Sequence, residues 1–147
     1  MTNHHVIAGC TGDQETGDWD LTASVVQDNL EPRTELARWD PENDLALLYV
    51  AEEFPTLTVG ASPTKGQPVM SVGSPYDLDG TVDAGTLSNI SDRFVTHSAG
   101  IGPGNSGGPL VDRLGNAIGV NTYRAVDSPA QNIAVRMRVA CQVILDC

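Results

Sequence analysis

The apolar residues of this chain fall into short runs separated by turn-forming residues. Most runs have the length of a β-strand, and several alternate apolar with polar positions. Runs of about four to eight such residues, bounded by Gly, Pro, Asn and Asp, are typical of strands. The expected strands lie at 21–29, 34–40, 44–51, 68–75, 80–90, 94–100, 108–112, 116–124 and 132–137, with a further strand opening the segment 54–67.

Some of these runs predict more than a strand. The run at 44–51, DLALLYVA, is apolar without interruption, which predicts a strand buried on both faces. The runs at 108–112 and 116–124 predict a hairpin with Gly115 in its turn. A helical spacing occurs near the C-terminus at about 138–146, where an apolar stripe comprises Val139, Ala140, Val143 and Ile144.

Composition agrees with an all-β architecture. The chain has 147 residues, of which 40% are hydrophobic, with 15 glycines and nine prolines spread between the runs. That length suits one domain or two small lobes. We predict a two-lobed antiparallel β-barrel protein with a short closing helix. The segment 54–67 would end in the connector between the lobes, which we place at 1–62 and 63–147.

Charge and cysteine content narrow the function classes. The formal net charge of −11 disfavours binding to nucleic acid. The sequence contains no apolar stretch of membrane-spanning length, and its first residues, MTNHHVIAG, do not resemble a signal peptide. The odd number of cysteines leaves two interpretations of Cys141 and Cys147 open, a disulfide or two small buried residues, while Cys10 would pair outside this chain.

The segment GIGPGNSGGPLVD is the most informative one for chemistry. Ser106 lies among four glycines, so the backbone there can adopt positive φ and present an exposed hydroxyl. In such a turn the N–H groups of Gly104 and Ser106 would stabilise an oxyanion. A glycine-rich hairpin loop with an incidental serine is the alternative, and the motif alone does not decide between them.

Two further segments supply the partners that a nucleophilic serine needs. TNHHV offers a histidine base, and WDPENDLALL offers a carboxylate to orient that base. In each segment the polar residue lies next to an apolar run that we expect to be a strand. The order along the chain is His, Asp, Ser, as in the chymotrypsin-type barrel.

Taken together, these motifs resemble those of trypsin-like serine proteases, and among them the high-temperature-requirement (HtrA/Deg) branch. The family carries T-N-x-H-V around its base, D-x-x-x-D-L-A-L-L around its acid and P-G-N-S-G-G-P-L-V around its nucleophile. The matching residues here are Thr2, Asn3, His5 and Val6, then Asp40 and 44–48, then 103–111. The segment 71–88 resembles the family's stretch that leads into the second barrel.

The resemblance implies a role for each matching residue. His5, not His4, would be the base, Asp44, not Asp40, the orienting acid, and Ser106 the nucleophile of an endopeptidase that needs no cofactor and no metal. Gly104 and Ser106 would form the oxyanion hole. Substrate-binding residues would be Gly100, Ile101, Asn121, Thr122 and Tyr123, with a preference for small or medium aliphatic side chains. The family also implies polypeptide substrates and an extracytoplasmic location.

One departure from the family leads to competing hypotheses. The family places strands before its histidine, whereas only residues 1–4 precede His5 here. We therefore expect an incomplete first barrel and an N-terminally truncated sequence. The favoured hypothesis is a serine endopeptidase. The alternatives are a degenerate module that binds peptides or is inactive, and a metal-binding module that uses His4, His5 and a carboxylate.

Overall fold

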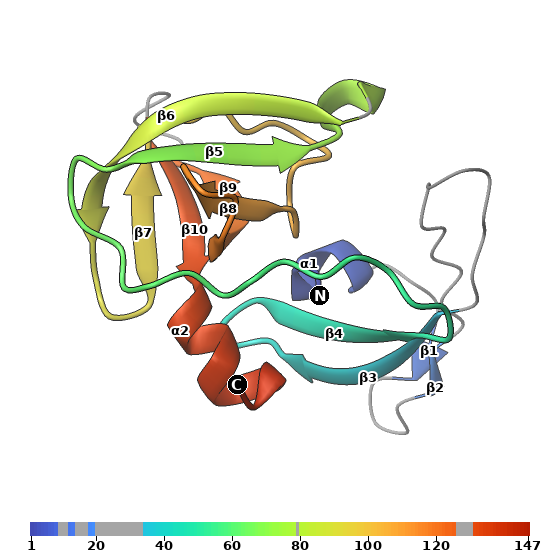
Figure 1. The fold of residues 1–147 in the computed structure, drawn as a ribbon. Helices are drawn as coiled ribbons and strands as arrows, with labels where there is room; N and C mark the ends of the chain where they lie inside the picture. The colour runs from blue at the N-terminus through green and yellow to red at the C-terminus, as the bar shows by residue number, and fades with distance from the viewer. Residues whose placement is uncertain (9–11, 14–17, 20–33, 79, 126–130) are drawn as a thin grey trace.

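The computed structural model describes residues 1–8, 12–13, 18–19, 34–78, 80–125 and 131–147. Figure 1 shows a barrel above, a two-stranded sheet below, and the N-terminal segment between them. The barrel is closed and antiparallel, in the strand order β10-β7-β6-β5-β8-β9. Its strands are β5 (Pro68–Gly73), β6 (Thr81–Ile90), β7 (Phe94–His97), β8 (Pro109–Asp112), β9 (Ala117–Arg124) and β10 (Asn132–Arg136).

The barrel interior is filled by alternate residues of its strands. Val95 on β7 pairs with Ala134 on β10, and both side chains are fully buried. This interior core comprises Val69, Leu87, Val95, Ala99, Leu110, Ile118 and Ala134. Burying one such Val or Leu side chain contributes about 1.5–3 kcal/mol. The alternating apolar residues of the strands therefore supply the interior core that stabilises the closed barrel.

The lower sheet pairs β3 (Thr34–Asp40) with β4 (Leu45–Val50). Among the described residues it is accompanied only by the short pair β1 (Gly12–Asp13) and β2 (Asp18–Trp19). Leu45 is fully buried in a second core that joins this sheet to the outside of β9 and β10. The mainly β, two-lobed architecture with a short closing helix is thus confirmed, and the described residues of the first lobe form no closed barrel.

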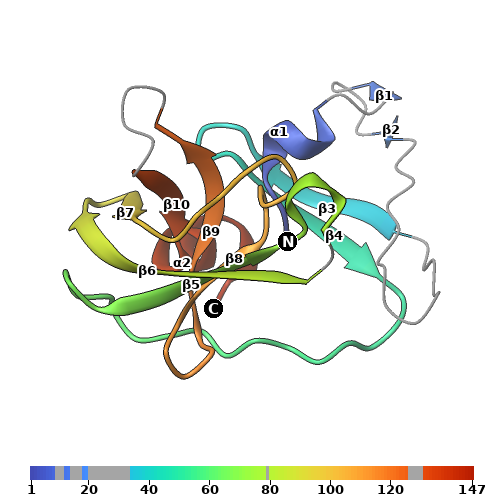
Figure 2. The same ribbon diagram turned by 90° about the horizontal axis from the view of Figure 1, so that it is seen from above.

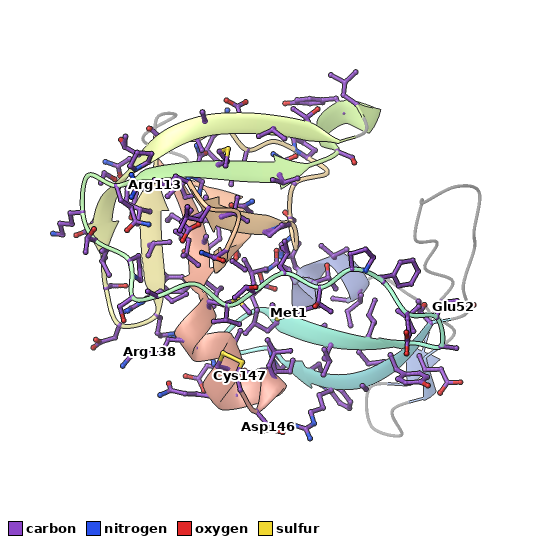
Figure 3. The ribbon with its side chains drawn as sticks, viewed as in Figure 1. Met1, Glu52, Arg113, Arg138, Asp146 and Cys147 are labelled. Atoms are coloured by element: carbon purple, nitrogen blue, oxygen red, sulfur yellow. A yellow bond between two sulfur atoms is a disulfide. The ribbon has the colours of Figure 1, made fainter. Side chains whose placement is uncertain are left out.

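The chain ends in a short helix that packs against both lobes. α2 (Met137–Ala140) begins one residue before the predicted helix and continues as a π-helical segment, η2 (Cys141–Leu145). Because of that segment Val143 is 42% exposed, so its predicted place on the apolar stripe is wrong, whereas Ile144 is buried. A disulfide joins Cys141 to Cys147, visible in yellow in Figure 3.

The C-terminus is also tied to the lower sheet. The side chain of Asp146 accepts a hydrogen bond of 2.5 Å from Arg38 on β3. Figure 3 shows Asp146 and Cys147 below the barrel, at the end of the closing helix. The helix and this ion pair therefore hold the two lobes in one arrangement.

Two predictions about the first lobe are wrong. No strand forms at 54–60; this part of the connector touches the barrel through one parallel bridge, Val59 to Ala117, and two backbone hydrogen bonds. Nor is the run at 44–51 buried on both faces, since Tyr49 is 60% exposed. Within the two-stranded sheet, the second core covers Leu45 of β4 but leaves Tyr49 open to solvent. The apolar sequence of a strand does not show which of its faces other segments will cover.

The remaining strand predictions agree with the structure within a few residues, except 21–29, which lies outside the described residues. β8 and β9 form the predicted hairpin. Gly115 lies in its turn with φ of 82°. The side chain of Asp112 accepts hydrogen bonds from the backbone N–H groups of Leu114 and Asn116 and so closes the same turn.

Candidate active site

Ser106 lies on a sharp turn between β7 and β8. The turn is closed by hydrogen bonds from Asn105 N to Gly102 O (2.9 Å) and from Gly108 N to Asn105 O (3.0 Å). Gly107, with φ of 85°, leaves no room for a side chain, because an added Cβ would lie 2.2 Å from Oγ1 of Thr2. The glycines of the motif therefore allow the N-terminal segment to pack directly on the serine turn.

Buried amides hold this turn from the barrel side. Asn105 and Asn121 are 3% and 0% exposed, and both direct Nδ2 toward the hydroxyl of Ser71, at 3.5 and 3.0 Å. Asn121 Nδ2 also donates to Pro109 O. The Nδ2 groups of the two amides thus tie the turn to β5 and β8, while Oδ1 of each has no partner among the described residues.

His5 lies on the short helix α1 (His4–Ile7), and the apolar run that follows it, which the sequence predicts as a strand, begins inside this helix. The segment before it is held to β4 by two hydrogen bonds between the backbones of Thr2 and Ala46. The side chain of Asn3 is fully buried, and its Nδ2 donates to Asp44 O (2.9 Å) and Thr122 Oγ1 (3.2 Å). Asn3 thus links the segments that carry the candidate base, the candidate acid and the edge of β9.

Asp44 and His5 form two hydrogen bonds. His5 Nδ1 lies 2.7 Å from Asp44 Oδ2, and the backbone N–H of His5 donates to Asp44 Oδ1 over 2.8 Å. With the proton on Nδ1, the other ring nitrogen is left free to accept one. Asp40, the neighbouring carboxylate, instead accepts from the backbone and side chain of Asn43 and caps the turn before β4.

Ser106 and His5 line the same cavity. It has a volume of about 420 Å³ and lies at the junction of the lobes that Figure 2 shows from above. The hydroxyl of Ser106 donates to the carbonyl of Thr122 over 3.1 Å, and none of the hydrogen bonds among the described residues joins it to His5.

The peptide groups of the serine turn have a defined orientation. Tyr76 N–H donates to Pro103 O, and Gly108 N–H donates to Asn105 O, each over 3.0 Å. In a trans peptide the N–H points opposite to the carbonyl. The N–H groups of Gly104 and Ser106 therefore point away from these bonds, and within the described part of the chain neither donates to another group. Two free donors on one turn suit an anionic oxygen.

Comparison with known proteins agrees with this geometry. The sequence model of the family described as trypsin-like peptidase domain matches residues 1–120. The chain belongs to that family.

Relatives of this peptidase domain include proteins described as probable periplasmic serine endoproteases, DegP-like. The one from Halomonas elongata is 37% identical over 83% of this chain and 26% of its own length. The one from Marinomonas sp. is 34% identical over 98% of this chain and 32% of its own length. The chain thus spans about a quarter to a third of these curated relatives. By sequence it is HtrA/Deg-like, as the motifs indicate.

Solved structures agree as well. The HtrA-type protease AlgW, determined with a decapeptide, superposes with a TM-score of 0.83 and is 32% identical, covering 99% of this chain and 46% of that chain. The serine endoprotease from Yersinia pestis gives 0.83 at 29% identity, covering 99% and 52%. The active form of the Rv3671c protease from M. tuberculosis superposes with a TM-score of 0.82 and covers 98% of this chain and 66% of that chain. It is 21% identical, so it supports the fold alone.

The peptidase domain has a free strand edge beside Ser106. Asn121 is the last residue of β9 that pairs with the serine side, through Gly107 N–H and Gly108 O. On the other side the register with β10 jumps from Asn121 to Tyr123, so Thr122 is the extra residue of a β-bulge. Among the described residues, no backbone group pairs with β9 on this side after Asn121, so the free edge begins at Thr122. Thr122 is itself only 3% exposed, whereas Tyr123 and Arg124 are exposed.

The other predicted substrate-binding residues are placed differently. Ile101, Thr122 and Tyr123 line the cavity, whereas Gly100 does not and lies against the carboxylate of Asp83. Sequence reasoning missed Tyr76 and Arg124, which also line it. Tyr76 has a positive φ of 53°, which no sequence signal indicated. Arg124 is the last residue of a predicted strand, so its position at the cavity was in principle readable.

His97 is distant from this chemistry although it is fully buried on β7. Burial lowers its pKa to about 4, and the nearby Ala99 backbone offsets that shift only in part. Neither ring nitrogen forms a hydrogen bond with the described residues. His97 is therefore held as a neutral core residue.

The described segments hold no metal centre and no membrane span. In them, no group of three or more His, Cys, Asp or Glu side chains could hold a metal ion. The helices of the same segments are all too short or too polar to cross a membrane.

Proposed function

We propose that this chain is a serine endopeptidase domain with Ser106 as nucleophile, His5 as general base and Asp44 as the residue that orients His5. The observation that carries the proposal is the double hydrogen bond between Asp44 and His5, made at the wall of the cavity that Ser106 also lines. A histidine oriented by a carboxylate, with a partly exposed serine on the same cavity wall, is the arrangement that activates a hydroxyl.

The reaction begins when a peptide carbonyl enters the cavity. Ser106 Oγ turns from Thr122 O toward His5 and attacks the carbonyl carbon, while its proton moves to the free ring nitrogen of His5. The N–H groups of Gly104 and Ser106 donate to the oxyanion of the tetrahedral intermediate. Asp44 keeps the imidazole oriented and stabilises its charged form.

The intermediate then collapses in two stages. His5 gives its proton to the leaving amine, the C–N bond breaks, and an ester links the substrate acyl group to Ser106. A water molecule, deprotonated by His5, attacks that ester. The C–Oγ bond breaks, His5 returns the proton to Ser106, and a free carboxylic acid product leaves.

Polypeptides are the substrate class that this site suits. An extended peptide can pair with the free edge of β9 that begins at Thr122, which is the β-augmentation mode of recognition. Ile101 on the cavity wall suits a small or medium aliphatic side chain next to the scissile bond. The periplasmic descriptions of the relatives support an extracytoplasmic location for this domain.

A second candidate function is favoured by one contact. Ser106 Oγ donates to Thr122 O and not to His5, which is what a module that binds peptides without cleaving them would show. Unliganded proteases also show loose catalytic hydrogen bonds that tighten when substrate binds. The bond from Asp44 to the ring Nδ1 of His5 orients a base that a pure binding module would not need, so we favour the enzyme.

Hydrolysis of an internally quenched peptide library distinguishes the two functions. The wild type is expected to release fluorescence at internal bonds, and Ser106→Ala, with equal thermal stability, is expected to bind the same peptides without cleaving them. Ser98→Ala is the matched serine control and should still cleave, because Ser98 lies exposed on the loop that follows β7 and does not line the cavity. Binding by a folded wild type with no cleavage would establish the binding module instead.

A further inference from the structure

One cavity residue carries a charge that the proposed reaction does not use. Arg124, the last residue of β9, lines the cavity together with His5 and Ser106. In the described part of the chain Arg124 forms no ion pair, whereas Arg38 pairs with Asp146 and Arg93 with Glu42. Among the described residues, the titratable ones that share the cavity wall with it are His5, Tyr76 and Tyr123, and none of them is a carboxylate.

An arginine without a carboxylate partner among the described residues is unusual in a chain as acidic as this one. The sequence contains 19 acidic and eight basic residues, so carboxylates far outnumber cations. Arg124 is nevertheless exposed at the cavity, away from the carboxylates that the described residues supply to Arg38 and Arg93. A guanidinium that opens onto a peptide-sized cavity is suited to pair with a carboxylate of the ligand.

The backbone of Arg124 shows where that carboxylate would lie. Ala125 N–H donates to Gln131 O on the side of β10 (2.9 Å). Successive residues of a strand direct their N–H and C=O groups to opposite sides. The groups of Arg124 therefore face the free edge, on the same side as the Thr122 carbonyl that Ser106 contacts.

A substrate strand on this edge has a defined register. Because Ser106 Oγ lies 3.1 Å from the Thr122 carbonyl, we take the substrate residue beside Thr122 as P1, the residue whose carbonyl Ser106 attacks. If the substrate runs antiparallel to β9, the residue beside Arg124 comes two positions before P1 and is P3, about 7 Å along the strand. Residues directly opposite in an antiparallel pair have Cβ atoms about 5 Å apart on the same face, within reach of an Arg–carboxylate contact.

We propose that Arg124 is a specificity-determining residue that selects substrates with Asp or Glu at P3. This inference rests on the proposed function, because a preference expressed in kcat/KM requires that the chain cleaves peptides. Exposed ion pairs of this kind change a binding equilibrium by about two- to fivefold. This preference at P3 adds to the proposed preference for small or medium aliphatic side chains at P1.

The test uses peptides that differ at one position, with Glu, Gln or Lys at P3, in about 0.1 M salt, where the Debye length of about 10 Å limits the influence of the distant acidic surface. For the wild type we expect kcat/KM to be about two- to fivefold higher with Glu than with Gln, and lowest with Lys. Arg124→Gln should bring the ratio of Glu to Gln to about one, and Arg124→Lys should keep part of it.

Arg113→Gln is the matched control, because Arg113 lies in the turn between β8 and β9, at the barrel end labelled in Figure 3, and does not line the cavity. That variant should keep the full ratio. A wild-type ratio of one, an unchanged ratio in Arg124→Gln, or a preference for Glu at P1 and not P3 would overturn the inference. If Arg124→Gln does not fold, the wild-type series and Arg124→Lys decide.

Failure of the proposed function is separated from failure of this inference by a binding measurement. The same peptides are titrated into Ser106→Ala, which cannot form an acyl-enzyme. Tighter binding of the Glu peptide supports Arg124 even if the wild type cleaves nothing. Equal binding of all three peptides overturns the role of Arg124 even if the wild type is an active protease.

Discussion

Asp44 accepts two hydrogen bonds from His5, one from the ring Nδ1 at 2.7 Å and one from the backbone N–H at 2.8 Å. A single carboxylate thus fixes both the side-chain orientation and the backbone position of the candidate base. Asp44 can do so because its own backbone is in the left-handed region, with φ of 55°, at the end of a turn that Asp40 caps. The pair joins the N-terminal helix to the lower sheet.

The first prediction follows from that pair. Asp44→Asn preserves the shape of the side chain but favours the wrong tautomer of His5, so kcat should fall by about 10⁴ with KM little changed. Peptide hydrolysis under initial-rate conditions measures both constants. Asp40→Asn is the control and should keep its activity, because Asp40 contacts Asn43 and not His5. Equal losses in the two variants would contradict the assignment of Asp44.

The second prediction concerns the oxyanion donors. Gly104 has φ of 101°, and a Cβ there would lie 2.2 Å from the carbonyl oxygen of Ser74. Gly104→Ala must therefore shift the turn and misdirect its N–H groups. Losing one oxyanion donor costs about 2.7–4 kcal/mol, so kcat should fall by about 10²–10³.

Gly115→Ala provides the control for backbone strain. Gly115 also has a positive φ, 82°, but open space surrounds it in the turn between β8 and β9. This variant should lose some stability and keep its kcat. If thermal unfolding shows that Gly104→Ala is folded and its kcat is unchanged, the oxyanion assignment fails.

The third prediction is an acid-dependent loss of stability that originates at His97. Its pKa in the folded state is about 4, against 6.5 for a free histidine. Between these values the unfolded chain binds a proton that the folded chain does not, so stability falls as the pH drops from 6.5 to about 4. Over that window the loss from this one group amounts to about 3 kcal/mol.

Urea unfolding at pH 7 and pH 4.5 measures this effect. His97→Gln should remove most of the difference between the two pH values, although it lowers stability at both. His4→Gln, which replaces a histidine outside the core, should leave the difference unchanged. An acid-dependent loss of the same size in His97→Gln and the wild type would show that other groups cause it.

Much of this fold could be predicted from the sequence because each barrel strand carries its own periodic signal. β7 shows this signal, because buried and partly buried residues alternate along FVTH. In the lower sheet, β3 also matches the predicted bounds 34–40. The run 44–51 and the connector 54–67 were predicted less well. Whether the apolar residues of these two runs are buried depends on which other segments pack against them, and the local sequence does not show that.

The candidate site divides in the same way. Ser106, His5 and Asp44 stand in motifs, and the structure places the last two in contact. The helix α1 was not predicted, because four residues are too few to show a helical period. Asn3 matters through hydrogen bonds to Asp44 and Thr122, which are far from it in the sequence, and pattern reasoning does not see such contacts.

The most direct test of the central claim is labelling with a fluorophosphonate, which reacts with a serine only when a base activates it. We expect the folded wild type to be labelled at Ser106, identified by mass spectrometry of the tryptic peptides. Ser106→Ala should not be labelled, and His5→Ala should be labelled far more slowly. Labelling that persists in Ser106→Ala, or a well-folded wild type that does not react, would contradict the claim that this chain is a serine protease.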